Sequence, residues 1–281
     1  MELNSVGVIG AGAMGSGIAQ VSAVAGYNVI LQDIYADALE RARVSIEKSL
    51  GKMVSKDKMA KADMDAALGR IQFTTVLEDA CKDADLIIEA VFENLEIKHD
   101  IFRKLTELCK KEAILGTNTS ALPITEIASV TDRGDKIIGV HFMNPVPLMK
   151  GVEVIRGQLT SDETMETVLA FIRNLGKESI IAVDYAGFIV SRMVDVIFNE
   201  AMKLIQEGNK PEEIDKACTL CLGHPMGPCR LLDLAGAEIA MHGMETMERD
   251  FGDEYKPHPL LKKRVLAGLL GKKTGRGFYE Y

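Results

Sequence analysis

The first two-thirds of the chain alternates short apolar runs with segments whose apolar residues recur at helical spacing. The apolar runs predict strands and the longer segments predict amphipathic helices. The expected strands are Val6–Ile9, Val29–Asp33, Ile71–Thr74, Leu86–Ala90, Ile114–Thr117, Ile137–His141, Val152–Ile155 and Ser179–Val183. The expected helices are Met14–Ala25, Asp37–Lys52, Lys58–Leu68, Leu95–Lys110 and a last one that Thr160-x-x-Glu163 opens as a capping box and that ends at Leu175. This alternation predicts an α/β domain with a largely parallel sheet and helices on both faces.

The pattern changes after Asp184, where only helical periodicity remains. The expected helices are Phe188–Gln206, Pro211–Leu222, Cys229–Phe251 and Leu260–Leu269. We therefore expect residues 1–184 to form the α/β domain and residues 185–281 to form an all-α C-terminal domain.

A glycine cluster directly follows the first expected strand and opens the first expected helix. It has the spacing G-x-G-x-x-G of a Rossmann-type dinucleotide-binding turn, and its members are Gly10, Ala11, Gly12, Ala13, Met14 and Gly15. In such a turn the first glycine allows the tight bend, the second admits the pyrophosphate, and the third permits close packing of helix on strand. The helix N-terminus then faces the pyrophosphate charge.

Asp33 ends the second expected strand, eighteen residues after Gly15. At that place an acidic side chain accepts hydrogen bonds from the ribose hydroxyls and repels a 2′-phosphate, which favours NAD over NADP. The alternative is that Asp33 only caps the end of the strand.

Two further strand ends carry polar residues that could bind a ligand or take part in acid–base catalysis. Asn118-Thr119-Ser120 follows one strand, at the edge where α/β sheets bind ligands, and His141 ends the next. Glu153 lies among β-branched residues, where a carboxylate is costly unless it is paired. His141, twelve residues upstream, is a suitable partner, because a carboxylate raises imidazole basicity and fixes its tautomer. The alternative is a buried histidine with a structural role.

Composition excludes several classes of protein. The 281 residues are 47% hydrophobic and 26% charged, as in ordinary globular proteins, so disorder and collagen-like repeats are excluded. The net charge of −8 provides no positive field for coating nucleic acid or a membrane surface. Residues 6–31 lack charge over a length that can span a bilayer, but they contain six glycines as well as Gln20 and Asn28, and the glycine cluster is better explained by the dinucleotide turn. We expect neither a leader peptide nor a membrane segment, and we expect a cytoplasmic protein.

The cysteines are five in number and unevenly spaced, which indicates a reducing compartment rather than a disulfide framework. Cys218, Cys221, His224 and Cys229 bring four soft ligands into twelve residues, so a zinc site must be considered. We favour small buried side chains on a helix instead, with Pro225 starting the next helix, and expect no metal.

The ordered motifs resemble the L-3-hydroxyacyl-CoA dehydrogenase family over essentially the whole chain. The resemblance rests on the glycine turn, Asn118–Ser120, His141-Phe-Met-Asn-Pro145, Val152-Glu-Val-Ile155, Gly187-Phe-Ile-Val-Ser-Arg192, Pro225-Met-Gly-Pro228 and Gly271-Lys-Lys-Thr-Gly-Arg-Gly-Phe-Tyr279. The length is closest to the short-chain bacterial branch that acts on 3-hydroxybutyryl-CoA. The resemblance implies reversible NAD-dependent oxidation of an (S)-3-hydroxyacyl-CoA to a 3-oxoacyl-CoA, such as 3-hydroxybutyryl-CoA to acetoacetyl-CoA. It also implies a homodimer formed through the C-terminal domain.

The resemblance also implies a role for each matched residue. His141 is the general base, Glu153 orients it, and Ser120 binds the substrate oxygen near the nicotinamide. Glu93, Lys98, Asn144 and Lys273 line the cofactor. Ser49 and Lys56 contact CoA, and they would share one helix face within a lysine cluster of Lys48, Lys52, Lys56, Lys58 and Lys61; a solvated helix face is the alternative.

Four positions, in three segments, depart from the family pattern. Ser191 replaces an asparagine, and we expect it to keep a polar role in the active site. Arg230 replaces an acidic residue, and Gly236-Ala237-Glu238 replaces Gly-Leu-Asp, changes expected to affect packing or the dimer. Two other functions remain open: a sugar-acid dehydrogenase of the gulonate type, which the lysine cluster disfavours, and a non-catalytic crystallin-like relative, which retention of His141, Glu153 and Ser120 disfavours.

Overall fold

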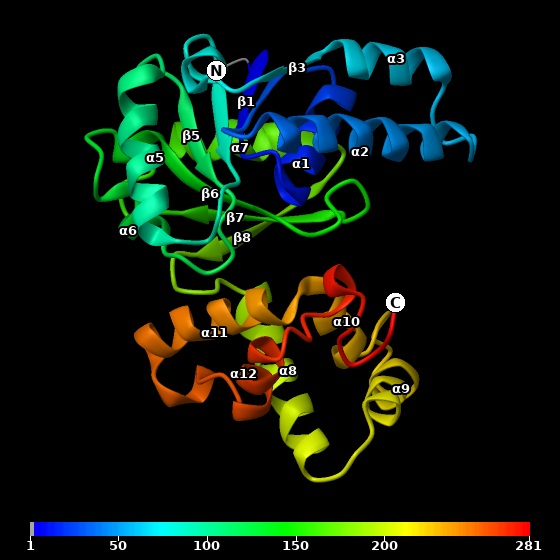
Figure 1. Ribbon diagram of the computed structural model, residues 1–281. Helices are drawn as coiled ribbons and strands as arrows, with labels where there is room; N and C mark the ends of the chain where they lie inside the picture. The colour runs from blue at the N-terminus through cyan, green and yellow to red at the C-terminus, as the bar shows by residue number, and fades with distance from the viewer. Residues whose placement is uncertain (1–2) are drawn as a thin grey trace. The chain divides into compact units, whose positions relative to one another are not determined.

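The computed structural model describes residues 3–281 and divides into two compact units, Met1–Asp184 and Tyr185–Tyr281 (Figure 1). The first unit is built on one eight-stranded sheet, in the order β3-β2-β1-β4-β5-β6-β7-β8. The strands are β1 Ser5–Ile9, β2 Asn28–Gln32, β3 Ile71–Thr74, β4 Leu86–Glu89, β5 Ile114–Thr117, β6 Ile137–Phe142, β7 Gly151–Arg156 and β8 Glu178–Val183. All neighbours are parallel except β6 and β7. The prediction of a largely parallel sheet is therefore confirmed.

Helices cover both faces of this sheet. One face carries α1 Ala13–Val24, α2 Ala36–Val54, α3 Lys61–Gly69 and α7 Asp162–Asn174; the other carries α4 Leu77–Cys81, α5 Leu95–Leu108 and α6 Ile124–Ala128. The short helices α4 and α6 were not predicted, because five residues are too few to show helical periodicity. In Figure 1, α2 runs past the edge of the sheet and α3 returns beside it.

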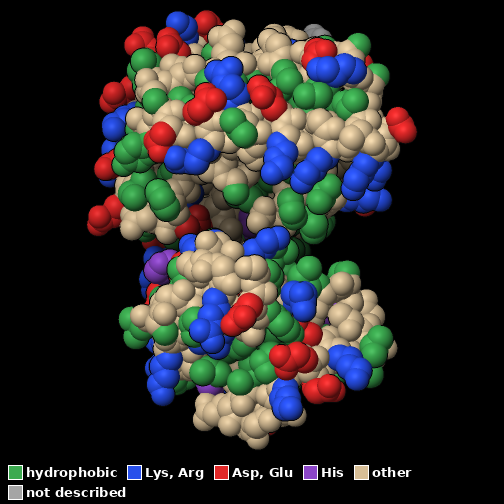
Figure 2. All heavy atoms as spheres, turned by 45° about the vertical axis from the view of Figure 1, so that its right-hand side comes forward, with side chains coloured by type: hydrophobic (Ala, Val, Ile, Leu, Met, Phe, Trp, Pro, Cys, Tyr) green, Lys and Arg blue, Asp and Glu red, His purple; other side chains and the backbone are tan. Residues whose placement is uncertain are grey.

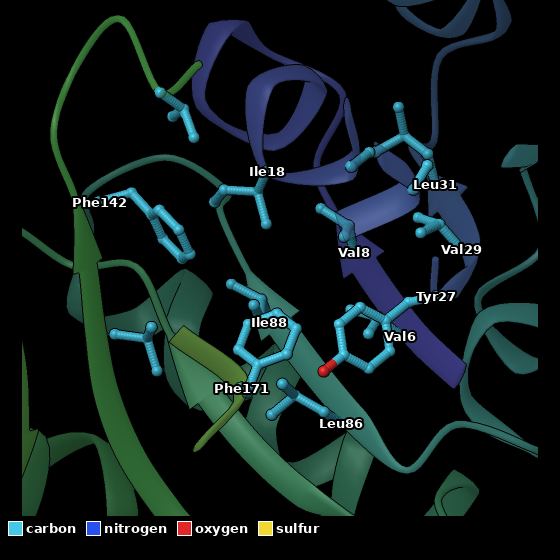
Figure 3. Close-up of a cluster of buried hydrophobic side chains, with 14 of the residues drawn as sticks. Val6, Val8, Ile18, Tyr27, Val29, Leu31, Leu86, Ile88, Phe142 and Phe171 are labelled. Atoms are coloured by element: carbon cyan, nitrogen blue, oxygen red, sulfur yellow. The ribbon is translucent and has the colours of Figure 1, made fainter. Parts of the chain in front are cut away.

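A large hydrophobic core lies between the sheet and the helices α1, α2, α3 and α7. Figure 3 shows Ile18 of α1 and Phe171 of α7 packed over Val6, Val8 and Ile88 of the central strands. Strands buried on both faces need continuous apolar runs, which is why β1 and β4 have few polar residues. The polar exceptions at the strand ends are therefore the residues to examine for function.

One predicted helix start is wrong. The cap of α7 is Ser161, whose side chain accepts a hydrogen bond from the Thr164 backbone N–H, and not Thr160. The Thr160 hydroxyl instead donates to the Ile137 carbonyl at 2.5 Å and so ties this turn to β6.

The second unit is helical, as predicted. It comprises α8 Val190–Gln206, α9 Pro211–Cys221, α10 Pro228–Ala235, α11 Ala237–Phe251 and α12 Pro259–Leu266. The prediction of a single helix over Cys229–Phe251 is wrong, because Gly236 has a φ of +102° and separates α10 from α11. The prediction that Pro225 starts a helix is also wrong, since α10 begins at Pro228.

The cysteines considered as zinc ligands differ in burial: Cys218 is half-buried, Cys221 is exposed and Cys229 is buried. Cys218 and Cys221 lie on α9, and Cys229 is buried against Ala201 and Ile214. Within residues 3–281, no three or more His, Cys, Asp and Glu side chains are grouped to hold a metal ion. Over the same residues, no helix combines the length and the apolar character needed to cross a bilayer.

Candidate active site

The glycine turn connects β1 to α1 and has the geometry that its spacing predicts. Gly10 has a φ of +101°, and a Cβ there would lie 2.6 Å from the Ala90 carbonyl oxygen. A Cβ on Gly15 would lie 1.8 Å from the Gly10 carbonyl oxygen, so α1 packs on the turn at a distance that only glycine permits. Gly12, the N-cap of α1, is exposed, and a Cβ there would meet no atom within 4 Å. The N-terminus of a twelve-residue helix is thus open to an anionic group beside Gly12.

Asp33 directly follows β2 and holds the glycine turn in place. One carboxylate oxygen accepts the Ala11 N–H at 2.7 Å, and the other accepts the Tyr35 N–H at 3.0 Å. Each oxygen has a second acceptor site, and the side chain is only partly buried. Asp33 therefore does cap the strand end, but it can also accept hydrogen bonds from a ribose. The turn lies where β1 is flanked by β2 and β4, the point at which an α/β sheet of this strand order binds dinucleotides.

His141 and Glu153 face each other across the antiparallel pair β6–β7. They are direct partners in the strand register, and His141 Nδ1 lies 2.7 Å from Glu153 Oε2. Glu153 is wholly buried and His141 is 6% exposed. A carboxylate only accepts hydrogen bonds, so Nδ1 carries the proton and Nε2 is the basic nitrogen. The predicted pairing of these residues is present, and it has the geometry of an oriented general base.

The Asn118–Ser120 segment is tied to both neighbouring strand ends. The Asn118 side-chain oxygen accepts the Phe142 N–H at 2.9 Å, next to His141. On the other side, Glu93 Oε1 accepts the Thr119 hydroxyl at 2.5 Å and the Ser120 N–H at 2.8 Å. The strand ends of β4, β5 and β6 thus bring Glu93, Ser120 and His141 to one edge of the sheet.

Lys98 has a different environment from the one the resemblance implies. Its side chain is 0% exposed and lies within α5, between Glu89 at 2.8 Å and Glu93 at 3.4 Å. It therefore contacts the two carboxylates and offers no surface to a ligand in this structure. Glu89 was missed by sequence reasoning, although a lone carboxylate ending the apolar strand Leu86-Ile-Ile-Glu89 is the same signal that identified Glu153.

The remaining candidate residues lie further along each unit. Asn144 is exposed just after β6, in a loop that packs against α1, since a Cβ on Gly17 would lie 2.7 Å from Val146. Ser49 is on α2, but Lys56 is not, because α2 ends at Val54. The premise that both share one helix face is therefore wrong.

In the second unit, Ser191 lies in the first turn of α8. Lys273 pairs with Glu238. Arg230 stacks over the Tyr279 ring at 4.3 Å.

Comparison with known proteins identifies the family. Residues 5–185 match the 3-hydroxyacyl-CoA dehydrogenase NAD binding domain, and residues 187–281 match the 3-hydroxyacyl-CoA dehydrogenase C-terminal domain. The chain belongs to the 3-hydroxyacyl-CoA dehydrogenase family. The NAD-binding assignment of the first unit agrees with the glycine turn and with Asp33.

Individual relatives are similar to this chain over nearly their full length. A probable 3-hydroxybutyryl-CoA dehydrogenase of Deinococcus radiodurans is 48% identical over 277 residues, covering 98% of this chain and 99% of that one. A 3-hydroxybutyryl-CoA dehydrogenase of Clostridioides difficile is 47% identical over 276 residues, covering 98% of each. The crystal structure of the (S)-3-hydroxybutyryl-CoA dehydrogenase PaaH1 from Ralstonia eutropha superposes with a TM-score of 0.92 at 41% identity, covering 100% of this chain and 99% of that one.

Proposed function

We propose that this dehydrogenase interconverts (S)-3-hydroxybutyryl-CoA and acetoacetyl-CoA with NAD. The observation that carries the proposal is the buried His141–Glu153 pair, at 2.7 Å, on the same sheet edge as the glycine turn and Ser120. Full-length relatives at 47–48% identity that are named for 3-hydroxybutyryl-CoA support the choice of substrate.

His141, Glu153 and Ser120 have different roles in the proposed reaction. His141 Nε2 accepts the proton of the substrate hydroxyl, and Glu153 stabilises the imidazolium that results. Ser120 binds the reacting oxygen and holds it toward His141. NAD, when bound, supplies the acceptor for the hydride that leaves the substrate carbon. In the reverse direction His141 returns the proton, so the same pair serves both directions.

The direct test is turnover of acetoacetyl-CoA with NADH, followed by loss of NADH absorbance. We expect oxidation of NADH that depends on acetoacetyl-CoA, and formation of the (S)-alcohol. The absence of turnover with acetoacetyl-CoA, together with turnover of a sugar acid, would replace the proposal by the gulonate-type alternative.

Asp33 predicts cofactor selectivity. Its charge repels a 2′-phosphate, so the wild type is expected to use NADH in preference to NADPH. Asp33→Asn retains an acceptor for the Ala11 N–H, 2.7 Å away, but removes the negative charge. Because the 2′-phosphate of NADPH is then no longer repelled, this variant should prefer NADH over NADPH less strongly. Asp33→Ala also loses that hydrogen bond, and should weaken both cofactors. Ratios of kcat/KM for the two cofactors measure this; a wild type that prefers NADPH contradicts the assignment.

The exposed lysines of α2, of the turn that follows it and at the first residue of α3 form the proposed CoA phosphate site, with Ser49 as a further contact. Figure 2, which brings the α2–α3 end of this unit forward, shows a row of Lys and Arg side chains on that side. The exposed lysines concerned are Lys48, Lys52, Lys56, Lys58 and Lys61. Such a patch offsets the net charge of −8 locally.

Reversing one of these charges should weaken substrate binding. Lys56→Glu is expected to raise KM for acetoacetyl-CoA with little change in kcat, and the effect should fade with added salt because exposed charges are screened. Lys104→Glu, on α5, makes the same change of charge at another exposed site and is the matched control. Equal KM values for the two variants at low salt would place CoA elsewhere.

We further propose that the protein is a cytoplasmic homodimer. The second unit supports the dimer, because it exposes large apolar side chains: Met193, Val196, Leu220, Leu222, Ile239 and Leu266. All five cysteines are free thiols, which supports a reducing compartment.

A further inference from the structure

A buried cluster of three charges lies at the carboxyl end of β4. Lys98 Nζ donates to Glu89 Oε1 at 2.8 Å and to Glu89 Oε2 at 3.0 Å, and Glu93 Oε2 lies 3.4 Å away. The Lys98 and Glu89 side chains are 0% exposed, and that of Glu93 is 27% exposed. Glu93 therefore forms the one edge of this cluster that solvent or a ligand reaches.

The three groups of the cluster shift one another's pKa values. Burial opposes charge on Lys98, but Glu89 and Glu93 outweigh it and raise the pKa of Lys98 above its ordinary value. Burial also opposes charge on Glu93, but Lys98 and three hydrogen bonds outweigh it and lower the pKa of Glu93. Each charge therefore depends on the others, because a buried ion that loses its partner is strongly destabilised.

The cluster is connected to the segment that carries Ser120. Glu93 Oε1 accepts the Thr119 hydroxyl and the N–H groups of Ser120 and Ala121, the last at 3.1 Å. Glu89 Oε2 also accepts the Thr117 hydroxyl at 2.7 Å, at the end of the strand that leads into this segment. Glu89 thus holds Thr117, which leads into the segment, and Glu93 holds the turn at Thr119, Ser120 and Ala121.

We infer that Glu89 is a positioning residue for the reaction: through Lys98 it fixes Glu93, and through Glu93 it fixes the backbone of Ser120. This inference rests on the proposed function for the role of Ser120. Glu89 itself reaches no ligand, so it acts only through the residues that it holds.

The opposite end of β4 provides a comparison within the same strand. Asp85 precedes β4, accepts the Asn4 and Ser5 N–H groups at 2.8 and 2.9 Å, and lies 2.5 Å from Lys110. This pair anchors β1 and the end of α5 without any contact to residues 117–121 among its hydrogen bonds. Asp85→Asn therefore tests what the loss of a strand-end ion pair does to stability alone.

The experiment compares Glu89→Gln with Asp85→Asn. We expect both to lower Tm, but only Glu89→Gln to lower kcat, by about 10- to 100-fold, because small misplacements of reacting groups are costly. KM for acetoacetyl-CoA should change little. Hydrogen exchange of the amides of Ser120 and Ala121, measured without substrate or cofactor, should speed up in Glu89→Gln and not in Asp85→Asn.

A second variant separates positioning from folding. Glu89→Leu with Lys98→Met replaces both charges by apolar groups of similar size, a change that often restores stability. We expect Tm to recover in part relative to Glu89→Gln, because Glu93 is 27% exposed and keeps its hydrogen bonds to the 119–121 segment. We expect kcat to stay low, because Glu93 has lost its cation. Recovery of kcat together with Tm, or unchanged exchange of the Ser120 and Ala121 amides in Glu89→Gln, would overturn the inference. A wild type without turnover of acetoacetyl-CoA would refute the proposed function instead, and amide exchange would still decide whether Glu89 holds the segment.

Discussion

His141→Ala is expected to lower kcat by roughly 10²–10⁴-fold, the usual effect of losing a positioned acid–base group. The reason is specific to this site: His141 Nε2 is the basic nitrogen, because Nδ1 donates to Glu153 at 2.7 Å. NADH affinity should be nearly unchanged, since the glycine turn and Asp33 follow β1 and β2, and two strands, β4 and β5, separate β1 from β6, which carries His141. Steady-state kinetics and fluorescence titration of NADH measure the two effects separately.

Glu153 provides the internal check on this assignment. Glu153→Gln is expected to reduce kcat while leaving NADH affinity intact, because Glu153 acts through His141. Residues that act as a unit are strongly non-additive, so the double variant should be about as slow as His141→Ala alone. Additive losses would show that the two residues act independently, and would exclude the pair as a unit.

The second large effect is expected at the glycine turn, where two glycines serve different purposes. A Cβ on Gly12 meets no protein atom within 4 Å, so Gly12→Ala should fold with the Tm of the wild type. The methyl group nevertheless occupies the space through which a pyrophosphate approaches the start of α1. We expect Kd for NADH to rise at least about tenfold, or about 1.4 kcal/mol in binding free energy.

Gly15→Ala should fail in a different way. Its Cβ would lie 1.8 Å from the Gly10 carbonyl oxygen, so α1 must move, and both Tm and NADH affinity should fall. Gly69→Ala, at the end of α3, adds a methyl group that meets nothing within 4 Å and is the control for both. If Gly12→Ala binds NADH as tightly as Gly69→Ala does, the pyrophosphate does not lie at this turn.

Much of this architecture follows from local patterns. Strand and helix positions can be predicted from apolar periodicity. The glycine turn can be predicted from its spacing, and the His141–Glu153 pair from the cost of burying an unpaired carboxylate. Gly236 shows the limit of periodicity: the apolar spacing is the same on both sides of it, and only its positive φ divides the helix. The prediction of the α7 cap failed for a similar reason. Thr160 and Ser161 are both good capping residues, but the Thr160 hydroxyl donates to the Ile137 carbonyl, so Ser161 caps the helix.

The buried charges illustrate a second limit. The Lys98 side chain gives no sign in the sequence that it is wholly buried, because lysine on a helix usually faces solvent. Its burial depends on Glu89, from a strand, and on Glu93, from a loop, and these meet Lys98 only when the sheet has formed. Such contacts come from tertiary structure, and no short window of sequence contains them.

The antiparallel pairing of β6 and β7 determines how the proposed active site can change over evolutionary time. His141 and Glu153 are opposite each other because of the strand register, not because of the length of the connection between them. The intervening loop, with Leu148 and Met149 exposed, can therefore vary without separating the pair. A deletion of one residue within either strand would instead turn one partner to the other face of the sheet. Natural variants of this protein should accordingly accumulate insertions near the exposed Leu148 and Met149, and almost none within the two strands.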